Sequence, residues 1–221
     1  MPIPPIAPYA MPTPEEVVAN QVSWTVEPER TALLIHDMQH YFLTAYDVGC
    51  EPASTLVANI SRLRDRCREL GIPVVYTMQP GDQHPSRRGI LADFWGTGMQ
   101  DGPDTEVIAE LRPDEDDIQV TKWRYSAFQR TDLRELLAYY GRDRLLVTGV
   151  YAHMGCMLSA AEAFMSDVCP FLVLDATADF SREEHLLALN YTARRCGAVV
   201  STGDLLRQLD TASAPVAAVL E

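Results

Sequence analysis

Short runs of consecutive apolar residues alternate along the chain with longer segments in which apolar residues recur every three or four positions. The first strong run, residues 32–35, is continuously apolar, as expected of a strand that a parallel sheet buries on both faces. The segment 53–70 places Leu56, Ile60 and Leu63 on one helical face. Further strands are predicted over 74–77, 118–121, 145–148, 171–174 and 198–200. Further helices are predicted over 104–111, 131–140, 155–167 and 182–196, with a last helix from about Thr202.

This alternation of strands and helices predicts the architecture. Six strands separated by helices indicate an α/β fold: a doubly wound six-stranded parallel sheet with helices on both faces, in a Rossmann-like three-layer arrangement. No linker divides the sequence, so a single domain over residues 1–221 is expected. Residues 1–29, rich in proline and polar groups, are predicted to form an extended N-terminal arm, and residues 211–221 a loose tail.

The carboxyl ends of the predicted strands carry chemically capable residues. In doubly wound sheets, ligands bind outside these ends. In this sequence they are Asp37, Gln79, Lys122 and Asp175, together with residues 151–155. Polar residues are common in any loop, but an acid, an amide and a lysine at neighbouring strand ends favour a functional site. A Gly- and Pro-rich segment over 79–103 is long for a connection in a compact domain, which also indicates function.

The charge balance limits the partners of the chain. Lys and Arg number 18 against 31 Asp and Glu, giving a formal net charge of −13, in a composition otherwise ordinary for a globular protein. A surface this acidic repels phosphate backbones and anionic lipids, so neither nucleic acid nor a membrane is expected as a partner. A small anionic substrate therefore requires basic groups gathered at one site.

Lys122 is the only lysine in the chain, all other basic residues being arginine. A bias toward arginine that left one lysine by chance is one explanation. The functional explanation is that this position requires a compact ammonium group with an adjustable pKa, which a guanidinium does not supply.

The cysteines and the N-terminal residues indicate the compartment. Five cysteines form no CxxC pair, and an odd number in an acidic chain of this size favours free thiols in a reducing environment. Residues 1–16 have neither the basic nor the apolar region of a signal peptide, and no apolar run approaches the roughly 18 residues of a membrane span. A cytoplasmic location is expected.

Three strings of residues occur at the ends of strands. They are HDMQ at 36–39, TKWRYSAF at 121–128 and GVYAHMGC at 149–156. Together they resemble the isochorismatase branch of the cysteine-hydrolase superfamily, and the likeness extends from the N-terminal arm to ADFSREEH at 178–185. The resemblance implies an isochorismatase-like fold, a hydrolase activity and assembly into a homodimer or a larger homo-oligomer.

The superfamily uses an Asp–Lys–Cys triad, and the resemblance assigns two of its members to Asp37 and Lys122. In nicotinamidase-type relatives the nucleophilic Cys lies six residues after the Gly that ends the fourth strand. Counted from Gly149, that position is Gly155, and Cys156 is one residue past it. One step near a helix start turns a side chain by about 100°, so Cys156 is expected to point into the packing and Gly155 to face the substrate.

Loss of the thiol is consistent with a different reaction. The resemblance implies hydrolysis of the enolpyruvyl vinyl ether of isochorismate to pyruvate and 2,3-dihydro-2,3-dihydroxybenzoate, with Asp37 as general acid and no covalent intermediate. This route requires no metal and no cofactor, and the sequence has neither HExxH nor DxHxxH. Because Lys122 lowers the pKa of Asp37, we expect the carboxylates of the dianionic substrate to raise it again in the complex. A structural Asp at a helix start is the alternative.

The resemblance also implies a set of substrate-binding residues. They are Gln79, Arg88, Trp95, Phe42, Tyr125 and Tyr151. Arg88 matches the family string and Arg87 is expected to be a solvated surface charge, whereas Arg124 is open between the ligand and a carboxylate of the protein. Core packing is the alternative for Trp95 and Phe42. A cis peptide between Val150 and Tyr151 is a further feature that the resemblance implies.

Three other functions remain open from the sequence. The first is hydrolysis of 2-amino-2-deoxyisochorismate to trans-2,3-dihydro-3-hydroxyanthranilate and pyruvate, the phenazine-type reaction. The second is an amidase that depends on Cys156, and the third is a protein that binds a small anion without catalysis. Substitution of Cys156 by Ala separates the amidase from the vinyl-ether hydrolase.

Overall fold

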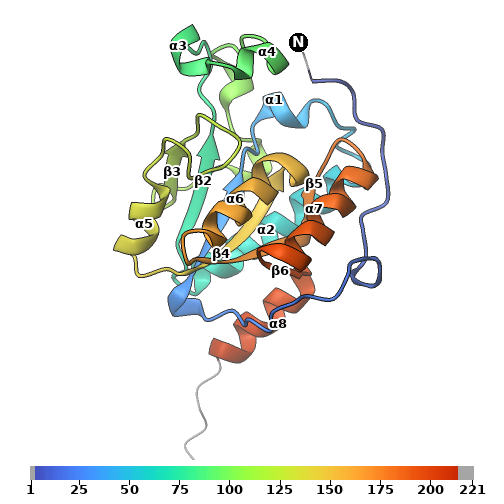
Figure 1. Cartoon of the computed structure of the whole chain (residues 1–221), viewed down its shortest axis with the longest axis vertical. Helices are drawn as coiled ribbons and strands as arrows, with labels where there is room; N and C mark the ends of the chain where they lie inside the picture. Colours follow the sequence, from blue (N-terminus) through green and yellow to red (C-terminus); the bar gives the residue numbers. More distant parts are fainter. Residues whose placement is uncertain (1–2, 214–221) are drawn as a thin grey trace, which may run out of the picture.

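The structure of the protein is a computed structural model that describes residues 3–213 (Figure 1). A six-stranded sheet with the order β3-β2-β1-β4-β5-β6 runs through its middle, and every pair of neighbours is parallel. The strands are β1 (Thr31–His36), β2 (Val74–Met78), β3 (Ile118–Thr121), β4 (Arg144–Val150), β5 (Cys169–Ala178) and β6 (Ala198–Val200). The predicted doubly wound parallel α/β fold is confirmed.

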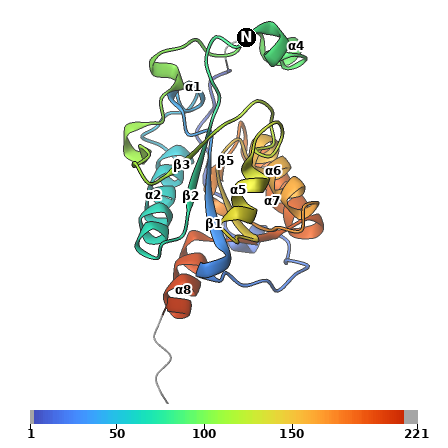
Figure 2. The same cartoon turned by 90° about the vertical axis from the view of Figure 1, so that its left-hand side faces the viewer.

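Helices cover both faces of the sheet (Figure 2). One face carries α2 (Ala53–Glu69) and α8 (Thr202–Ser213), and the other carries α5 (Leu133–Tyr139), α6 (Met157–Phe164) and α7 (Arg182–Arg195). Three short helices lie at the carboxyl end of the strands: α1 (His40–Leu43), α3 (Pro85–Arg88) and α4 (Leu91–Trp95). None of these described helices is long and apolar enough to cross a membrane.

The central strand β1 joins two hydrophobic cores. All six of its residues are buried, and successive side chains point to opposite faces of the sheet. Leu33 and Ile35 pack in the core beneath α2 and α8, while Ala32 and Leu34 pack in the core beneath α5 and α6. The continuous apolar run at 32–35 is therefore explained by burial on both faces.

Two sequence predictions about element boundaries are wrong. No helix spans 104–111; the structure has 3₁₀ turns at Pro103–Thr105 and Ala109–Leu111. Between them Val107 pairs as an isolated bridge with Gln39, so its backbone bonds to another segment instead of to a helical turn. The tail predicted from 211 is also misplaced, because α8 continues to Ser213; residues 214–221 lie outside the described part of the chain.

The N-terminal arm lies along the domain as an extended segment interrupted by 3₁₀ turns at Pro14–Glu16 and Pro28–Arg30. The amide of Val18 donates to Asn190 Oδ1 at 2.9 Å, and Asn20 Nδ2 donates to the carbonyl of Val199 at 2.9 Å. The start of the arm crosses the carboxyl end of the sheet, where Ile3 lines a cavity. The arm is thus bonded to the last helix–strand pair of the sheet.

Candidate active site

The cavity lies where the strand order reverses. The chain proceeds outward from β1 to β2 and β3 and then returns to place β4 on the other side of β1. The connections from β1 and β4 therefore leave in opposite directions, which opens a crevice outside their carboxyl ends. Asp37, Gln79 and Lys122 follow β1, β2 and β3 within one residue of the strand end, and Tyr151 follows β4. All four line the cavity.

The bottom of the cavity is a buried ion pair with supporting hydrogen bonds. Lys122 Nζ lies 2.9 Å from Asp37 Oδ2, and the two side chains are 1% and 4% exposed. Thr77 Oγ1 donates to Asp37 Oδ1 at 2.8 Å, and Gln79 Nε2 donates to Oδ2 at 3.0 Å. Lys122 Nζ also donates to the carbonyl of Arg124 at 2.7 Å. We call Asp37, Thr77, Gln79 and Lys122 the polar floor.

The surroundings of Asp37 favour its ionised form in this structure. Burial acts to raise the pKa of Asp37, but His36, Lys122 and the hydrogen bond from Gln79 act in the other direction and the net pKa is lowered. The residue has a φ of +50°, in the left-handed region that is uncommon for residues other than glycine. Its backbone is held there by the hydrogen bond from Asp37 N to the carbonyl of Thr77, at 3.2 Å.

Positions 155 and 156 point in different directions, as the one-residue step predicts. Gly155 lines the cavity. Cys156 is fully buried among apolar residues, and its thiol donates to the carbonyl of Thr148 at 3.8 Å. Burial raises the pKa of Cys156 well above its ordinary value, so the thiol is neutral and poorly nucleophilic. The turn that contains both residues is a π-helical turn, Ala152–Cys156, rather than the start of the predicted α-helix.

Four aromatic rings enclose the opposite side of the cavity. Tyr151 stacks on Phe180 with ring centroids 4.2 Å apart, and Phe180 stacks on Trp95 at 6.1 Å. Phe42 meets Tyr151 edge to face at 6.1 Å, and Tyr151 Oη donates to the carbonyl of Phe42 at 2.9 Å. We call Phe42, Trp95, Tyr151 and Phe180 the aromatic cover. Residues of the floor and of the cover line the same cavity, the polar floor on one side and apolar rings on the other.

Two guanidinium groups reach the cavity. Arg88 is 6% exposed, and its Nε donates to the carbonyl of Gly96 at 3.1 Å, whereas the neighbouring Arg87 is exposed and lies over the ring of Trp123. Arg124 Nη1 donates to the carbonyls of Arg87 and Trp123. Within residues 3–213, neither Arg88 nor Arg124 forms an ion pair with a carboxylate of the protein. The cavity therefore presents positive charge without an internal counter-ion.

The residues proposed from sequence for substrate binding meet in this cavity, each in a defined setting. Trp95 is partly exposed and its Nε1 donates to Tyr125 Oη at 2.7 Å, so it is not a core residue. Phe42 both packs in the core and lines the cavity. The peptide between Val150 and Tyr151 is cis, as the resemblance implies. Sequence reasoning missed Phe180, whose position shortly after the fifth strand was the available signal.

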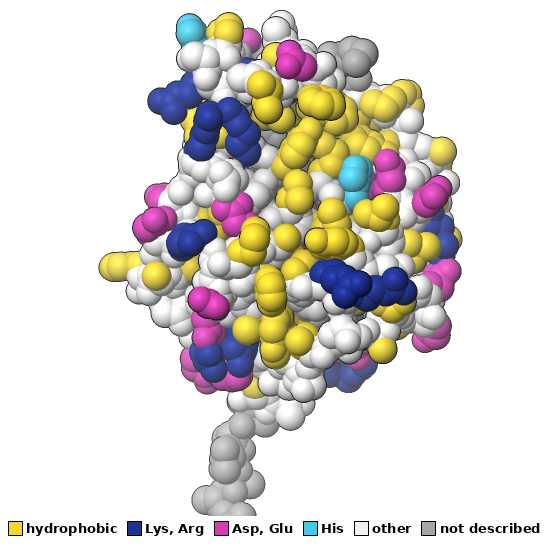
Figure 3. Space-filling view, viewed as in Figure 1, with side chains coloured by type: hydrophobic (Ala, Val, Ile, Leu, Met, Phe, Trp, Pro, Cys, Tyr) yellow, Lys and Arg dark blue, Asp and Glu magenta, His cyan; other side chains and the backbone are white. Residues whose placement is uncertain are grey.

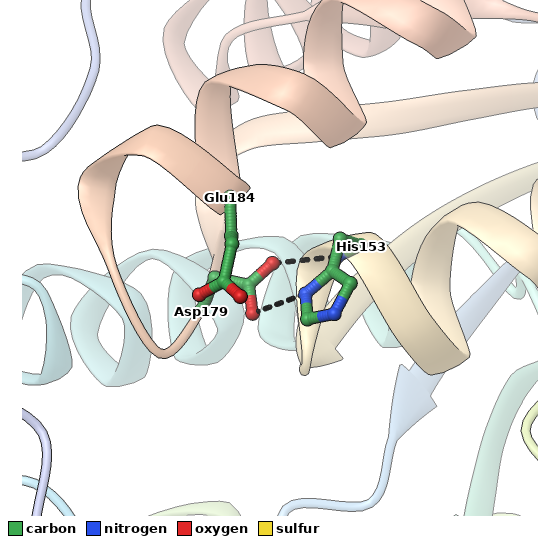
Figure 4. A group of neighbouring side chains, drawn as sticks. All are labelled: His153, Asp179 and Glu184. Carbon is green, nitrogen blue, oxygen red and sulfur yellow. Dashed lines mark hydrogen bonds and ion pairs between the residues drawn. The ribbon is translucent and has the colours of Figure 1, made fainter.

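A histidine and two carboxylates lie together beside the aromatic cover (Figure 4). Asp179 is fully buried; its Oδ1 accepts from His153 Nδ1 at 2.7 Å and its Oδ2 from the amide of His153 at 2.6 Å. Glu184 accepts instead from Ser181 Oγ at 2.9 Å, in the N-terminal cap of α7. The hydrogen bond to Asp179 raises the pKa of His153 despite its partial burial. These contacts identify an ion pair of His153 with Asp179 beside a helix cap. The ion pair holds in place the turn that carries Gly155.

Comparison with known proteins places these features in a family. A family model described as the isochorismatase domain matches residues 31–204. An isochorismatase of Bacillus subtilis is 53% identical over 217 residues, which cover 98% of this chain and 70% of that protein. The phenazine biosynthesis protein PhzD1 of Pseudomonas aeruginosa is 48% identical over 205 residues, covering 92% of this chain and 98% of that protein.

A solved structure agrees with these sequence matches. The crystal structure of a cysteine hydrolase from Pseudomonas syringae pv. phaseolicola superposes with a TM-score of 0.80 at 25% identity. The match covers 86% of this chain and 97% of that one. Fold, family model and relatives agree with one another, and the chain belongs to the isochorismatase family.

Proposed function

We propose that this protein hydrolyses the enolpyruvyl vinyl ether of isochorismate, giving pyruvate and 2,3-dihydro-2,3-dihydroxybenzoate. The observation that supports this reaction best is the pairing of Asp37 with Lys122 at the bottom of an enclosed cavity in which position 155 has no side chain. Such a site offers an acid and a cation for a carboxylate of the substrate, but no thiol nucleophile. Family membership and the 53% identity to an isochorismatase support the same reaction.

The chemistry uses Asp37 as the only proton donor to carbon. Protonated Asp37 transfers its proton to the terminal methylene carbon of the vinyl ether, which leaves an oxocarbenium ion beside the Asp37 carboxylate and Lys122. Water adds to the cationic carbon and returns a proton to Asp37. The resulting hemiketal breaks its bond to the ring oxygen, its hydroxyl proton passes to that oxygen, and pyruvate and the dihydrodiol result. A positioned acid of this kind contributes about 10²–10⁴-fold to the rate.

Substrate binding supplies the protonation state that this reaction requires. In the free protein the pKa of Asp37 is lowered, with His36 and Lys122 opposing the effect of burial. When the carboxylates of the substrate engage Arg88, Arg124 and Lys122, their negative charge offsets the positive charge that lowers the pKa of Asp37. The pKa of Asp37 then rises toward the range in which an acid donates near neutral pH.

The remaining residues of the proposed site bind and orient the dianion. Gln79 holds the Asp37 carboxylate, and Arg88 provides the cation nearest the segment that contains Trp95. Phe42, Trp95 and Tyr151 enclose the ring of the substrate, and Tyr125 fixes Trp95 through its hydroxyl. Gly155 lines the cavity but supplies no nucleophile at the position where an amidase relative has its thiol.

One assay distinguishes the open alternatives. Pyruvate release, followed with lactate dehydrogenase, is measured on isochorismate and on its 2-amino analogue; the likeness to PhzD1 makes the second substrate the specific alternative. We expect turnover of isochorismate to exceed that of the amino analogue, and the reverse preference would assign the phenazine-type reaction. Tight binding without pyruvate release would indicate a non-catalytic protein. Loss of activity in Cys156→Ala would indicate the amidase.

We further propose that the chain forms a homodimer or larger homo-oligomer through the outer face of α6 and α7. Leu158, Met165, Leu187 and Tyr191 are 39%, 73%, 54% and 48% exposed, and Figure 3 shows apolar side chains gathered along the middle of this face. A patch of this kind is typical of an association surface. Light scattering is expected to give at least twice the chain mass, and Leu187→Glu to lower it; a monomeric wild type would refute the proposal.

A further inference from the structure

The ring of His36 occupies the space that a side chain at position 155 would need. His36 ends β1 and is 1% exposed. A Cβ added to Gly155 would lie 2.0 Å from His36 Cε1, 2.6 Å from Nε2 and 2.9 Å from Nδ1, all shorter than real Cβ contacts. The absence of a side chain at 155 therefore has a physical cause within this protein, apart from any change of reaction.

The backbone of His36 meets a second glycine. A Cβ on Gly149 would lie 2.1 Å from the carbonyl oxygen of His36, and Gly149 has a φ of +105°, which residues with a side chain rarely adopt. The end of β4 thus approaches His36 closely twice, once at its backbone and once at its ring. Residue 36 and the 149–155 segment are fitted to each other.

The imidazole is held in place by carbonyl groups on two different elements. Nδ1 lies 2.7 Å from the carbonyl oxygen of Val150, at the end of β4, and Nε2 lies 3.2 Å from that of Tyr125, in the loop after β3. A carbonyl oxygen only accepts, so the shorter contact assigns the ring hydrogen to Nδ1; the neutral ring donates to Val150, and Nε2 packs against the carbonyl of Tyr125. A buried ring with these contacts cannot move aside to make room for a larger side chain at a neighbouring position.

The two carbonyls belong to segments that carry the proposed site. Val150 directly precedes Tyr151 of the aromatic cover. The carbonyl of Tyr125 accepts from Lys122 Nζ, at 3.4 Å, so the imidazole and the ammonium contact the same carbonyl group. Asp37 is the next residue after His36, and its Oδ1 lies 3.8 Å from His36 Nδ1. A single ring therefore contacts the three segments that carry Asp37, Lys122 and Tyr151.

We propose that His36 is a positioning residue that excludes any side chain at position 155, donates to the Val150 carbonyl and packs against that of Tyr125, so that Lys122 and Tyr151 face the substrate. Residues 36 and 155 form an exclusive pair: an imidazole at 36 requires glycine at 155. This inference rests on the proposed function only for its catalytic part, because the exclusion is a property of the folded protein.

A double-mutant cycle on the full chain tests the exclusion without substrate. Gly155→Ala is expected to lower Tm by about 2–12 °C, the range that overpacking produces in a chain of this size. In the His36→Val background the same substitution is expected to cost less than half as much. Gly203→Ala is the matched control, because a Cβ there lies 3.5 Å from its nearest neighbour. An equal cost in both backgrounds, or a cost no larger than that of the control, overturns the exclusion.

Kinetics of pyruvate release test the positioning role. His36→Val is expected to lower kcat by about 10²-fold with a small change in KM, the effect of a misplaced catalytic group rather than of lost binding. His36→Asn, whose amide nitrogen can replace Nδ1 as donor to Val150, is expected to recover at least tenfold of that loss. An unchanged kcat in His36→Val, or no recovery in the Asn variant, overturns the role. If the wild type releases no pyruvate, the proposed function fails while the Tm cycle still decides the exclusion.

Discussion

The polar floor and the aromatic cover enclose the same cavity but are built in different ways. Asp37 and Lys122 stand at the ends of buried parallel strands and are held by an ion pair and hydrogen bonds with few alternatives. The cover comes from connections: Trp95 ends a short helix in which Phe94 is 66% exposed, and Ile90 just before that helix is 76% exposed. The rings of the cover pack on one another, which tolerates small shifts, and two hydrogen bonds, from Trp95 and Tyr151, supplement that packing. The sheet therefore places the chemistry, whereas the connections place the enclosure.

Asp37→Asn removes the acidic group of the polar floor, and of the substitutions considered it is expected to have the largest effect on activity. The amide occupies nearly the same volume but does not donate a proton as an acid, so kcat is expected to fall by about 10²–10⁴-fold with KM little changed. The measurement is pyruvate release at saturating substrate. The exposed Asp116 supplies the control as Asp116→Asn, which is expected to retain full activity. Activity of Asp37→Asn above one tenth of wild type would be inconsistent with a general acid.

Lys122→Met tests whether the floor depends on charge pairing. The substitution leaves the Asp37 carboxylate buried without its cation, a change that costs about 3–5 kcal/mol of folding free energy. It also removes one of the influences that lower the pKa of Asp37. Urea denaturation measures the free energy, and Lys122→Arg is expected to restore little because a guanidinium does not fit the same contacts. A loss below 1 kcal/mol would mean that the ion pair is not structural.

Arg88→Met tests the buried arginine of the cavity, which belongs to neither the polar floor nor the aromatic cover. A hydrogen bond to a charged group contributes about 1.5–3 kcal/mol, so KM is expected to rise about 10–100-fold while kcat changes less. Arg87→Met is the matched control, since the adjacent arginine is exposed and lies over Trp123. Equal effects of the two substitutions would remove Arg88 from the site.

Cys156→Ala removes a thiol that packs behind the floor. Because the side chain is fully buried and burial raises its pKa, we expect unchanged kcat and KM and a stability loss of about 1 kcal/mol. The exposed Cys50 is expected to react with a thiol reagent in the folded protein and Cys156 only after unfolding. Reaction of Cys156 in the folded state, or loss of turnover in the variant, would contradict its place in the core.

The pair of His153 with Asp179 predicts the smallest effect, on the turn beneath the cover. The hydrogen bond that His153 donates to Asp179 raises the pKa of His153, so the folded state binds this proton more tightly than the unfolded chain. Its stabilisation is complete below about pH 6.5 and is lost as pH rises through the raised pKa. For this partly exposed pair the loss is below about 1 kcal/mol. Wild type minus His153→Gln unfolding free energies at pH 5.5 and 9 measure it; a difference that grows with pH would contradict the assignment.

The fold and the floor were predictable because both depend on local pattern. A continuous apolar run identifies a buried parallel strand, and the residue after such a strand belongs at the ligand-binding edge, which is how Asp37 and Lys122 were found. The segment 104–111 was wrongly expected to be helical, because the pairing of Val107 with Gln39 is a contact across the fold that no window of sequence contains.

The cover and the role of His36 depend on contacts between distant residues. Phe180 joins the site only because it stacks on Tyr151 and Trp95, which come from other connections. In the sequence, His36 is one polar residue at a strand end. Its close contact with Gly155 forms only when β1 and β4 are adjacent. Side-chain volume at a tertiary contact has no periodic signature, so neither was visible before the structure.

The N-terminal arm has a consequence for the order in which the protein is completed during synthesis. The ribosome makes the arm first, yet Asn20 is bonded to Val199, 179 residues later in the chain. Val18 and Asn20 therefore find their partners only when α7 and β6 have emerged, whereas the amides of Ile6 and Tyr9 bond to the earlier carbonyls of Ala45 and Glu51. Ile3, which lines the cavity, lies in the part of the arm whose partners are made early. The arm is therefore completed in two stages: its start can bond once residues 45–51 have been made, and its middle only after the last helix–strand pair of the sheet, by which time the whole polar floor has been made.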